Sequence, residues 1–296
     1  MHQPELARQA HGLAPFHRPR PVRVLAVASG KGGVGKTNVS VNLGVAFAEM
    51  GRRTMLLDAD LGLANVDVLL GLEVPYNLSH LLTGERELDE IIVTGPAGLK
   101  IVPASSGVAR LANLSPAEHA GVIGAFSSLA EPVDILIVDV AAGISHSVLQ
   151  FCAAAQDVAV VVCDEPSSLT DAYALVKVLA RDYGVRRFHT VTNRVDSRSH
   201  GQRLHQKLQA VSDRFLEIPL QHLGIIPEDP LLRRAVQMQA PVVTTYPTSP
   251  AARAFKELAR SADNLPEPRG MSGCIEFFLE RLAAPASRED DLRAVG

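Results

Sequence analysis

Short, continuous runs of apolar residues alternate along the chain with longer stretches in which apolar residues recur every three to four positions. The short runs are rich in Val, Ile and Leu and apolar on both faces, which is typical of buried parallel strands. They cover residues 22–28, 53–58, 99–104, 133–140, 157–163, 188–193 and 222–227. The longer stretches predict helices, for example over 36–50, 116–129, 167–183 and 201–215. Strands that alternate with helices indicate βαβ units. We therefore expect an α/β fold with a doubly wound, mostly parallel sheet and helices on both faces.

All seven runs fit one sheet, so the sequence predicts a single domain over residues 21–262. Residues 1–20 are rich in Pro and His and lack a sustained apolar period, which predicts a mobile tail with at most one short helix. Residues 263–273 are rich in Pro, Gly and Ser and predict a linker. A short apolar segment, 274–284, and a charged tail, 285–296, complete the chain.

Composition narrows the class of protein. The 296 residues carry a formal charge of −3, and 47% of them are hydrophobic, so wholesale disorder and a collagen-like fibre are excluded. The near-neutral balance gives no whole-chain reason to expect nucleic-acid binding. Three scattered cysteines without a C-x-x-C pair fit a reducing compartment, and no apolar stretch approaches the ~20 residues of a membrane span. We expect a cytoplasmic protein.

The sequence GKGGVGKT at 30–37 satisfies the phosphate-loop pattern G-x-x-x-x-G-K-[ST] between a predicted strand and a predicted helix. Glycines let successive backbone N–H groups curl around phosphates at the positive end of the following helix. The pattern predicts that Lys36 contacts the β and γ phosphates and that the Thr37 hydroxyl binds Mg²⁺. ATP or ADP with Mg²⁺ is therefore the expected ligand. The expected contacts are Gly30, Lys31, Gly32, Gly33, Val34, Gly35, Lys36, Thr37 and Asn38.

Carboxylates end two of the predicted strands. Asp58 ends the second run and Asp60 lies two residues further on, and Asp139 closes the run 133–140 just before Gly143. Ligands of open α/β sheets bind at the carboxyl ends of strands. Asp60 is placed to orient a water or to join the Mg²⁺ shell, Asp139 to hold Mg²⁺ through water, and the Gly143 N–H to contact a γ-phosphate. Helix capping stays open for Asp58, and a capped or hydrogen-bonded strand end stays open for Asp139.

Lys31 is not required by the general phosphate-loop pattern. With it, residues 30–37 resemble the deviant Walker A loop of the MinD/ParA ATPases, whose signature lysine reaches across a dimer to the partner's nucleotide. The resemblance implies that Lys31, Lys36 and Asp60 are catalytic, with Asp60 activating water in switch I. It also implies that Thr37, Asp60 and Asp139 serve the metal. Val140 departs from the family, whose switch II often carries a small polar residue at this position.

The same resemblance places two further segments beside adenine. Asn193 ends a predicted strand, and Pro227 and Glu228 follow another, as in MinD-like proteins where the matching residues flank the base. Ordinary turn chemistry remains the alternative for these residues. Asn65 and Asp67 follow Asp60 in the segment that corresponds to switch I.

Longer phrases, among them 29–72, 102–107, 162–179 and 223–236, resemble the MinD-type FlhG/FleN family of flagellar-number regulators. This implies a slow ATPase that forms an ATP-dependent homodimer and restrains a flagellar master transcription activator of the FleQ/FlrA type. Some members carry an N-terminal D-Q-A-x-x-L-R motif that stimulates an FlhF-type GTPase. Residues 8–14 keep Gln9, Ala10 and Leu13 of that motif, but Arg8 and Ala14 replace its charged ends.

Two further interactions are weighed. At 100° per residue one face of 274–284 is apolar, which favours either reversible contact with the inner face of the cell membrane or docking on the protein itself. That face holds Ile275, Phe278, Leu279, Leu282 and Ala283.

DNA binding, as in a ParA-like partition protein, or a nucleotide-stabilised scaffold with little turnover is the weaker alternative. The basic candidates for DNA, which are mixed with acids, are Arg181, Arg186, Arg187, Arg194 and Arg203.

Overall fold

The computed structural model describes residues 21–60, 66–103, 116–129, 132–266 and 275–283. Eight strands form one sheet in the order β3-β4-β2-β5-β1-β6-β7-β8. All neighbouring pairs are parallel except β3 and β4. The strands are β1 (Arg23–Ser29), β2 (Thr54–Ala59), β3 (Val93–Thr94), β4 (Lys100–Val102), β5 (Ile135–Ala142), β6 (Asp157–Val162), β7 (Phe188–Val195) and β8 (Leu220–Pro227). The seven predicted runs are confirmed as strands of one sheet. The edge strand β3 was not predicted because two residues are too short to show a period.

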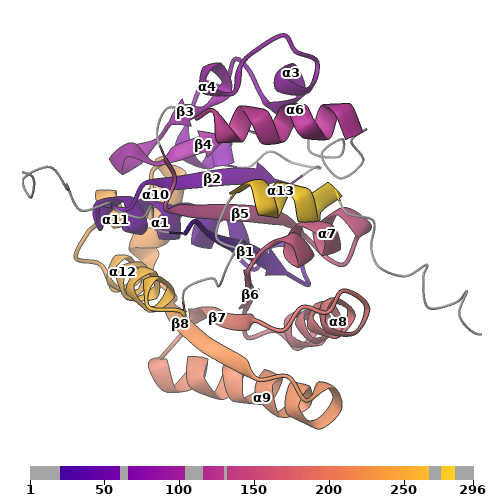
Figure 1. Cartoon of the computed structure of the whole chain (residues 1–296). Helices are drawn as coiled ribbons and strands as arrows, with labels where there is room; N and C mark the ends of the chain where they lie inside the picture. The colour runs from indigo at the N-terminus through magenta and orange to yellow at the C-terminus, as the bar shows by residue number, and fades with distance from the viewer. Residues whose placement is uncertain (1–20, 61–65, 104–115, 130–131, 267–274, 284–296) are drawn as a thin grey trace, which may run out of the picture.

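Helices cover both faces of the sheet, as predicted (Figure 1). On one face, α3, α4, α6, α7, α8, α9 and α13 pack on the sheet, and on the other α1, α2, α10, α11 and α12 do. Their bounds are α1 (Lys36–Glu49), α2 (Val66–Leu70), α3 (Leu78–Leu82), α4 (Leu88–Ile91), α6 (Pro116–Ser127), α7 (His146–Ala154), α8 (Pro166–Asp182), α9 (Arg198–Leu216), α10 (Pro230–Gln237), α11 (Val242–Thr245), α12 (Pro250–Asp263) and α13 (Ile275–Ala283). A 3₁₀ turn, η1 (Pro96–Gly98), precedes β4.

The predicted helix over 201–215 begins three residues earlier, at Arg198. Ser197 caps it, because its Oγ accepts a hydrogen bond from the backbone N–H of His200 at 3.2 Å. The first turn of α9 is polar, and its residues show no apolar period. The hydrophobic pattern therefore did not predict this turn. The cap fixes the position at which the chain turns from β7 into α9, beside the carboxyl edge of the sheet.

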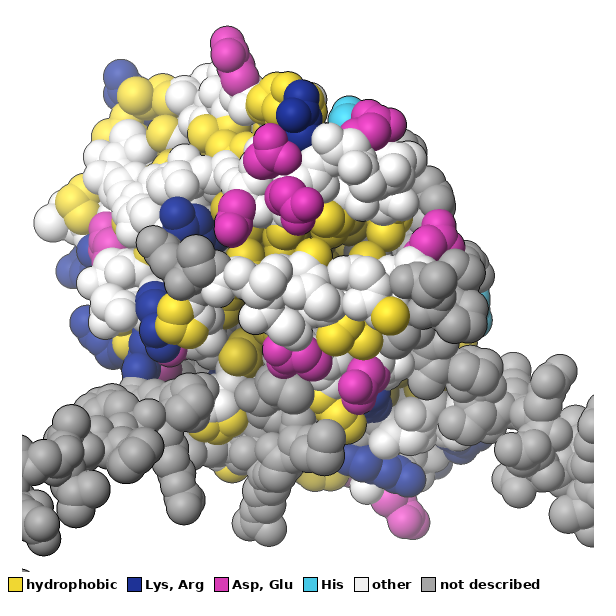
Figure 2. All heavy atoms as spheres, turned by 45° about the horizontal axis from the view of Figure 1, so that its top comes forward, with side chains coloured by type: hydrophobic (Ala, Val, Ile, Leu, Met, Phe, Trp, Pro, Cys, Tyr) yellow, Lys and Arg dark blue, Asp and Glu magenta, His cyan; other side chains and the backbone are white. Residues whose placement is uncertain are grey.

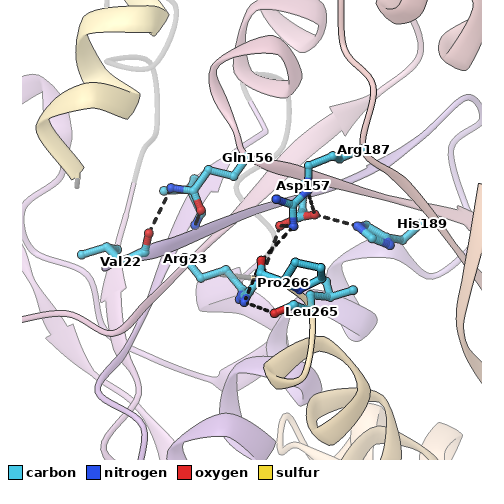
Figure 3. A network of polar contacts seen from close by, with 9 residues as sticks. Val22, Arg23, Gln156, Asp157, Arg187, His189, Leu265 and Pro266 are labelled. Carbon is cyan, nitrogen blue, oxygen red and sulfur yellow. Dashed lines mark hydrogen bonds and ion pairs between the residues drawn. The ribbon is translucent and has the colours of Figure 1, made fainter. Parts of the chain in front are cut away.

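The opposite edge of the sheet, where the strands begin, contains a buried polar cluster around Asp157 (Figure 3). The Asp157 carboxylate is fully buried and accepts hydrogen bonds from Arg23, Arg187 and His189. The same two arginines also donate to the backbone carbonyls of Leu265 and Pro266. This Asp157 cluster therefore ties the chain that leaves α12 to the start of β1, β6 and β7.

Helix α13 docks on the domain instead of standing away from it. Its residues Ile275, Phe278, Leu279 and Leu282 are 2–5% exposed and pack against the core shared with α6 and α7. Glu276 accepts a hydrogen bond from Ser127 at 2.8 Å, which fixes the helix to the end of α6. Within the described part of the chain, no helix is both long and apolar enough to cross a membrane. The expected domain, linker and tail boundaries stay predictions.

Candidate functional site

The phosphate loop joins β1 to α1 at the carboxyl edge of the sheet, and two of its glycines meet requirements no other residue satisfies. A Cβ on Gly30 would lie 2.2 Å from the carbonyl carbon of Asp171 in α8. Gly35 has φ of +88°, and a Cβ there would lie 2.5 Å from the side-chain nitrogen of Asn193. The loop therefore approaches α8 and β7 closely while its backbone turns into α1.

The side chain of Lys36, 6% exposed, points back under the loop to Asp139 at the end of β5. Its Nζ donates to Asp139 Oδ1 at 2.9 Å, and the Ser40 hydroxyl donates to the same oxygen at 2.7 Å. The other oxygen, Asp139 Oδ2, is buried and accepts no hydrogen bond from the residues that the structure describes. Because a buried carboxylate oxygen without a partner is costly, it marks a position suited to a cation or its water. Ser40 was missed, although its place four residues after Lys36 puts both on one face of α1.

Asp58 lies directly beside Asp139, because the two residues are paired in register on β2 and β5. Burial, together with the negative charge of Asp139, raises the pKa of Asp58 to about 6. Asp58 also accepts hydrogen bonds from the backbone N–H groups of Asp60 and Val66, at 3.2 and 3.3 Å. It thus caps the start of α2, which is the structural alternative left open for it. The half-buried Asp60 follows at the tip of the same strand.

Lys31, in contrast to Lys36, extends toward solvent. Its Nζ contacts Glu165 Oε2 at 2.5 Å and Ser167 Oγ at 2.9 Å, both at the start of α8. The hydrogen bond between Lys31 and Glu165 raises the pKa of the lysine and lowers that of the glutamate. Glu165 and Ser167 were not predicted, because they contact Lys31 from a segment 134 to 136 residues away.

The residues predicted to contact adenine lie at the same edge, and the side chain of one of them, Asn193, bonds to the phosphate loop. Asn193 is 3% exposed, and its amide donates to the Val34 carbonyl at 2.8 Å. Its Oδ1 is buried and has no hydrogen-bond partner in the described part of the chain. Arg194 donates to the Gly33 carbonyl at 3.3 Å and lies 3.7 Å from Glu228. Pro227 ends β8 and is half-buried. Arg194, one of the basic candidates for DNA binding, therefore bonds to the phosphate loop of its own chain.

The segment after Asp139 is turned toward β1. The Gly143 N–H donates to the Ser29 carbonyl at 2.9 Å, so contact with a γ-phosphate requires exchange of this bond. Val140 is fully buried in the core below α7 and does not face the site. Asn65, Cys274 and residues 8–14 lie outside the described residues.

The structure brings Lys36, Thr37, Asp58, Asp60 and Asp139 together at the ends of β1, β2 and β5. Among the described residues no group of three or more His, Cys, Asp or Glu side chains could hold a metal by itself. Thr37, Asp139 and a bound phosphate together would supply the oxygen ligands that Mg²⁺ prefers. The arrangement can hold a phosphate chain, but the individual roles of these residues stay predictions.

Comparisons with known proteins agree with this geometry. The family model described as the CobQ/CobB/MinD/ParA nucleotide binding domain matches residues 25–242. The chain is 53% identical over 262 residues to the antiactivator FleN of Pseudomonas aeruginosa, covering 88% of this chain and 94% of that protein. It is 34% identical over 216 residues to the flagellum site-determining protein YlxH of Helicobacter pylori, with 73% of each chain covered. The solved structure of the septum site-determining protein MinD with Mg-ADP from Pyrococcus horikoshii superimposes with a TM-score of 0.65 at 29% identity. That match covers 82% of this chain and 97% of the other.

Proposed function

The chain belongs to the CobQ/CobB/MinD/ParA family of nucleotide-binding proteins, and from this membership we propose an ATP-gated dimer that limits the number of flagella. Its ATPase activity is of the MinD/ParA type, with nucleotide and Mg²⁺ as the ligands of the site. The phosphate-loop sequence predicted this membership, and the comparisons confirm it. The dimer and the partners below are parts of the proposal.

The proposed nucleotide switch rests on one observation. Lys36 and Asp139 form a buried ion pair, and no described residue donates a hydrogen bond to the other oxygen of Asp139. When nucleotide is bound, Lys36 exchanges Asp139 for the β and γ phosphates, and Asp139 is left to hold the water shell of Mg²⁺. When bound there, Mg²⁺ would supply positive charge that neutralises the phosphates. Asp60 orients the attacking water from the tip of β2. Each state thus satisfies Lys36 with a different partner, which is what a two-state element requires.

Lys31 connects the switch to the dimer. In the single chain the Lys31 ammonium is exposed and contacts Glu165 and Ser167. A negatively charged phosphate can take the place of these two partners. In the dimer Lys31 reaches the partner's nucleotide and supplies positive charge where it develops during phosphoryl transfer, as an arginine finger does. The partner subunit's Lys31 completes this site in return.

The position of α13 supports a link from nucleotide state to membrane contact. The apolar face of α13 packs on α7, and α7 begins three residues after Gly143. Rearrangement of 139–145 would move the surface on which α13 lies, so the ATP form would release the helix to a lipid surface. The chain would then be cytoplasmic with peripheral attachment at the inner face of the membrane.

The partners follow from the named relatives. The similarity to an antiactivator supports a flagellar transcription activator of the FleQ/FlrA type as the target of the ATP form. An FlhF-type GTPase is a second proposed partner, through residues 8–14.

Solution mass tests the dimer. Asp60→Ala protein, which should bind but not hydrolyse ATP, is measured by light scattering with Mg²⁺ and either ATP or ADP. A doubling of mass with ATP alone is expected. Lys31→Ala should lose hydrolysis by roughly 10³-fold or more, while the exposed Lys177→Ala on α8 serves as a matched control. An unchanged mass with ATP binding confirmed would leave the nucleotide-stabilised scaffold as the better account.

DNA binding receives little support from the positions of its candidate residues. Arg187 and Arg194 stand at opposite ends of β7, roughly 23 Å apart at 3.3 Å per residue. Both are engaged within the chain, by Asp157 and by Gly33, and Arg181 donates to the Phe215 carbonyl. Titration with duplex DNA at low and moderate salt tests this alternative, because phosphate contacts weaken steeply as salt rises.

A further inference from the structure

A groove of about 540 Å³ runs between α6 and the segment that joins α3 to α4, away from the nucleotide site. Leu81, Leu82 and Val122 give it apolar walls, and the charged residues that line it are Arg86, Glu87 and Glu118. Leu81 and Leu82 are half-buried, so part of their apolar surface faces the groove and not the core. The described residues leave this surface uncovered.

Two glycines keep the groove open along α6. Gly121 and Gly124 lie inside a helix, where glycine is less favourable than alanine. Beyond the backbone of α6 itself, no atom of the described residues lies within 4 Å of the Cβ that either position could carry, so packing within the described chain does not require glycine there. Another segment can therefore approach the backbone of α6 closely at these two positions.

The groove is flanked by negative charge. The adjoining segment 85–90 contains four acidic residues and one arginine. That arginine, Arg86, is turned to Tyr76, with its guanidinium 4.3 Å from the ring centre and 2.9 Å from the hydroxyl. In Figure 2 acidic side chains border an exposed hydrophobic strip on this part of the molecule. An apolar segment with basic neighbours is the complementary occupant.

The N-terminal segment of the same chain has this chemistry. Leu6, Ala10 and Leu13 recur at the spacing of one helix face, and residues 1–20 contain three arginines and one acidic residue. Strand β1 begins beside the segment that follows α6, because the Arg23 N–H donates to the carbonyl of Asp134, seven residues after the end of α6. Residues 14–20, with two prolines, would span about 22 Å at ~3.1 Å per residue.

We propose that residues 6–13 dock as a short helix in this groove of their own chain. Leu6, Ala10 and Leu13 then cover the apolar walls, and the arginines of the tail lie beside the acidic segment 85–90. Docking hides Ala10 and Leu13, two of the residues that the N-terminal motif retains. The tail is thus withheld from partners until one with higher affinity displaces it. The inference goes beyond the proposed function and does not depend on nucleotide or on the dimer.

Cross-linking in the full chain tests the docking. Ala10→Cys is combined with Ser128→Cys in this groove, or with Ser261→Cys in a second groove of about 520 Å³ between β8, α9 and α12. The second groove is lined by Arg198 and Arg253 and should repel the basic tail. Cys274→Ser is present throughout, and Cys152 and Cys163 are buried. A short bis-maleimide should join residues 10 and 128 within one chain at least about tenfold faster than residues 10 and 261.

Two tail variants separate the apolar face from charge alone. Leu13→Asp and Gly12→Asp add the same charge at neighbouring positions, but only Leu13 lies on the face with Leu6 and Ala10. Leu13→Asp should abolish the preference for residue 128, and Gly12→Asp should reduce it less. Neither can unfold the described domain. Equal rates at the two grooves, equal effects of the two variants, or cross-links only between chains would each overturn docking within the chain.

Discussion

Two aspartates with identical burial, Asp139 and Asp157, show how differently the two edges of this sheet are built. Both are fully buried and both face a cation. Asp157 uses both oxygens: Oδ1 accepts from Arg187 and His189, and Oδ2 accepts from Arg23 and Arg187. Asp139 accepts hydrogen bonds from Lys36 and Ser40 through one oxygen, and no described residue donates to its Oδ2.

Burial and charge alone therefore do not distinguish a structural carboxylate from a ligand-binding one. Asp157 begins β6, where strands start and where the chain leaves α12. Asp139 lies near the end of β5, at the edge where open α/β sheets bind ligands. A saturated carboxylate stabilises one arrangement, whereas one with a free oxygen can accept a second. Hydrogen-bond saturation is therefore the property to test.

The largest effect is expected from Asp157→Ala. The change leaves the guanidinium of Arg23, 6% exposed, without its carboxylate, and should lower the free energy of unfolding by about 3–5 kcal/mol. Urea denaturation measures this loss. Asp134→Ala, which breaks the more exposed pair with Arg53, is the control and should cost less. Unchanged stability of Asp157→Ala would mean that saturation does not make this aspartate structural.

Asp139→Asn should instead remove the response to ligand. A protein that binds Mg-ATP at 100 times its Kd gains about 2.7 kcal/mol of stability. Wild type and the folded fraction of Asp157→Ala should show this gain, and Asp139→Asn should lose most of it. Thermal unfolding with and without Mg-ATP gives the comparison directly. Equal gains in the two aspartate variants would contradict the assignment of the two edges.

Asp58→Asn sharpens the comparison through pH. The folded pKa of Asp58, about 6, exceeds its ordinary value of 3.8, so between these values the folded protein binds the proton more tightly than the unfolded chain does. The free energy of unfolding of wild type should therefore fall, relative to the variant, as pH rises from about 4 to about 6. The slope is at most about 1.4 kcal/mol per pH unit, and it levels off above pH 6. Denaturation of both proteins across this range measures it, and parallel profiles would refute the raised pKa.

The smallest effect on stability is expected from Glu165→Gln. This variant weakens the exposed pair with Lys31, and pairs of this kind contribute little because solvent screens them. The thermal unfolding midpoint should stay unchanged. With Lys31 released, the dimer measured with Asp60→Ala and ATP should form at lower protein concentration. A large loss of stability would place this pair with the structural Asp157 cluster.

Particular residues show which features of the fold and the site could be predicted from the sequence. The phosphate loop was found because glycine spacing and the lysine are local requirements of phosphate binding. The seven strand runs were found because a buried parallel strand must be apolar on both faces. Glu165 and Ser167 were missed because their contact with Lys31 depends on how α8 packs beside the loop, which no local pattern encodes. The first turn of α9 was missed because its polar residues show no period.

Seven strands of the sheet, four of the helices, the position of the phosphate loop and the family to which the chain belongs could be derived from the sequence alone. These depend on periodicity and on short motifs, which are properties of neighbouring residues. Three features could be read only from the folded structure: the hydrogen-bond saturation of Asp157 but not of Asp139, the bond between Lys36 and Asp139, and the docking of α13 on α6 and α7. Each of these joins residues far apart in the chain, and their distances are set by packing of the whole core.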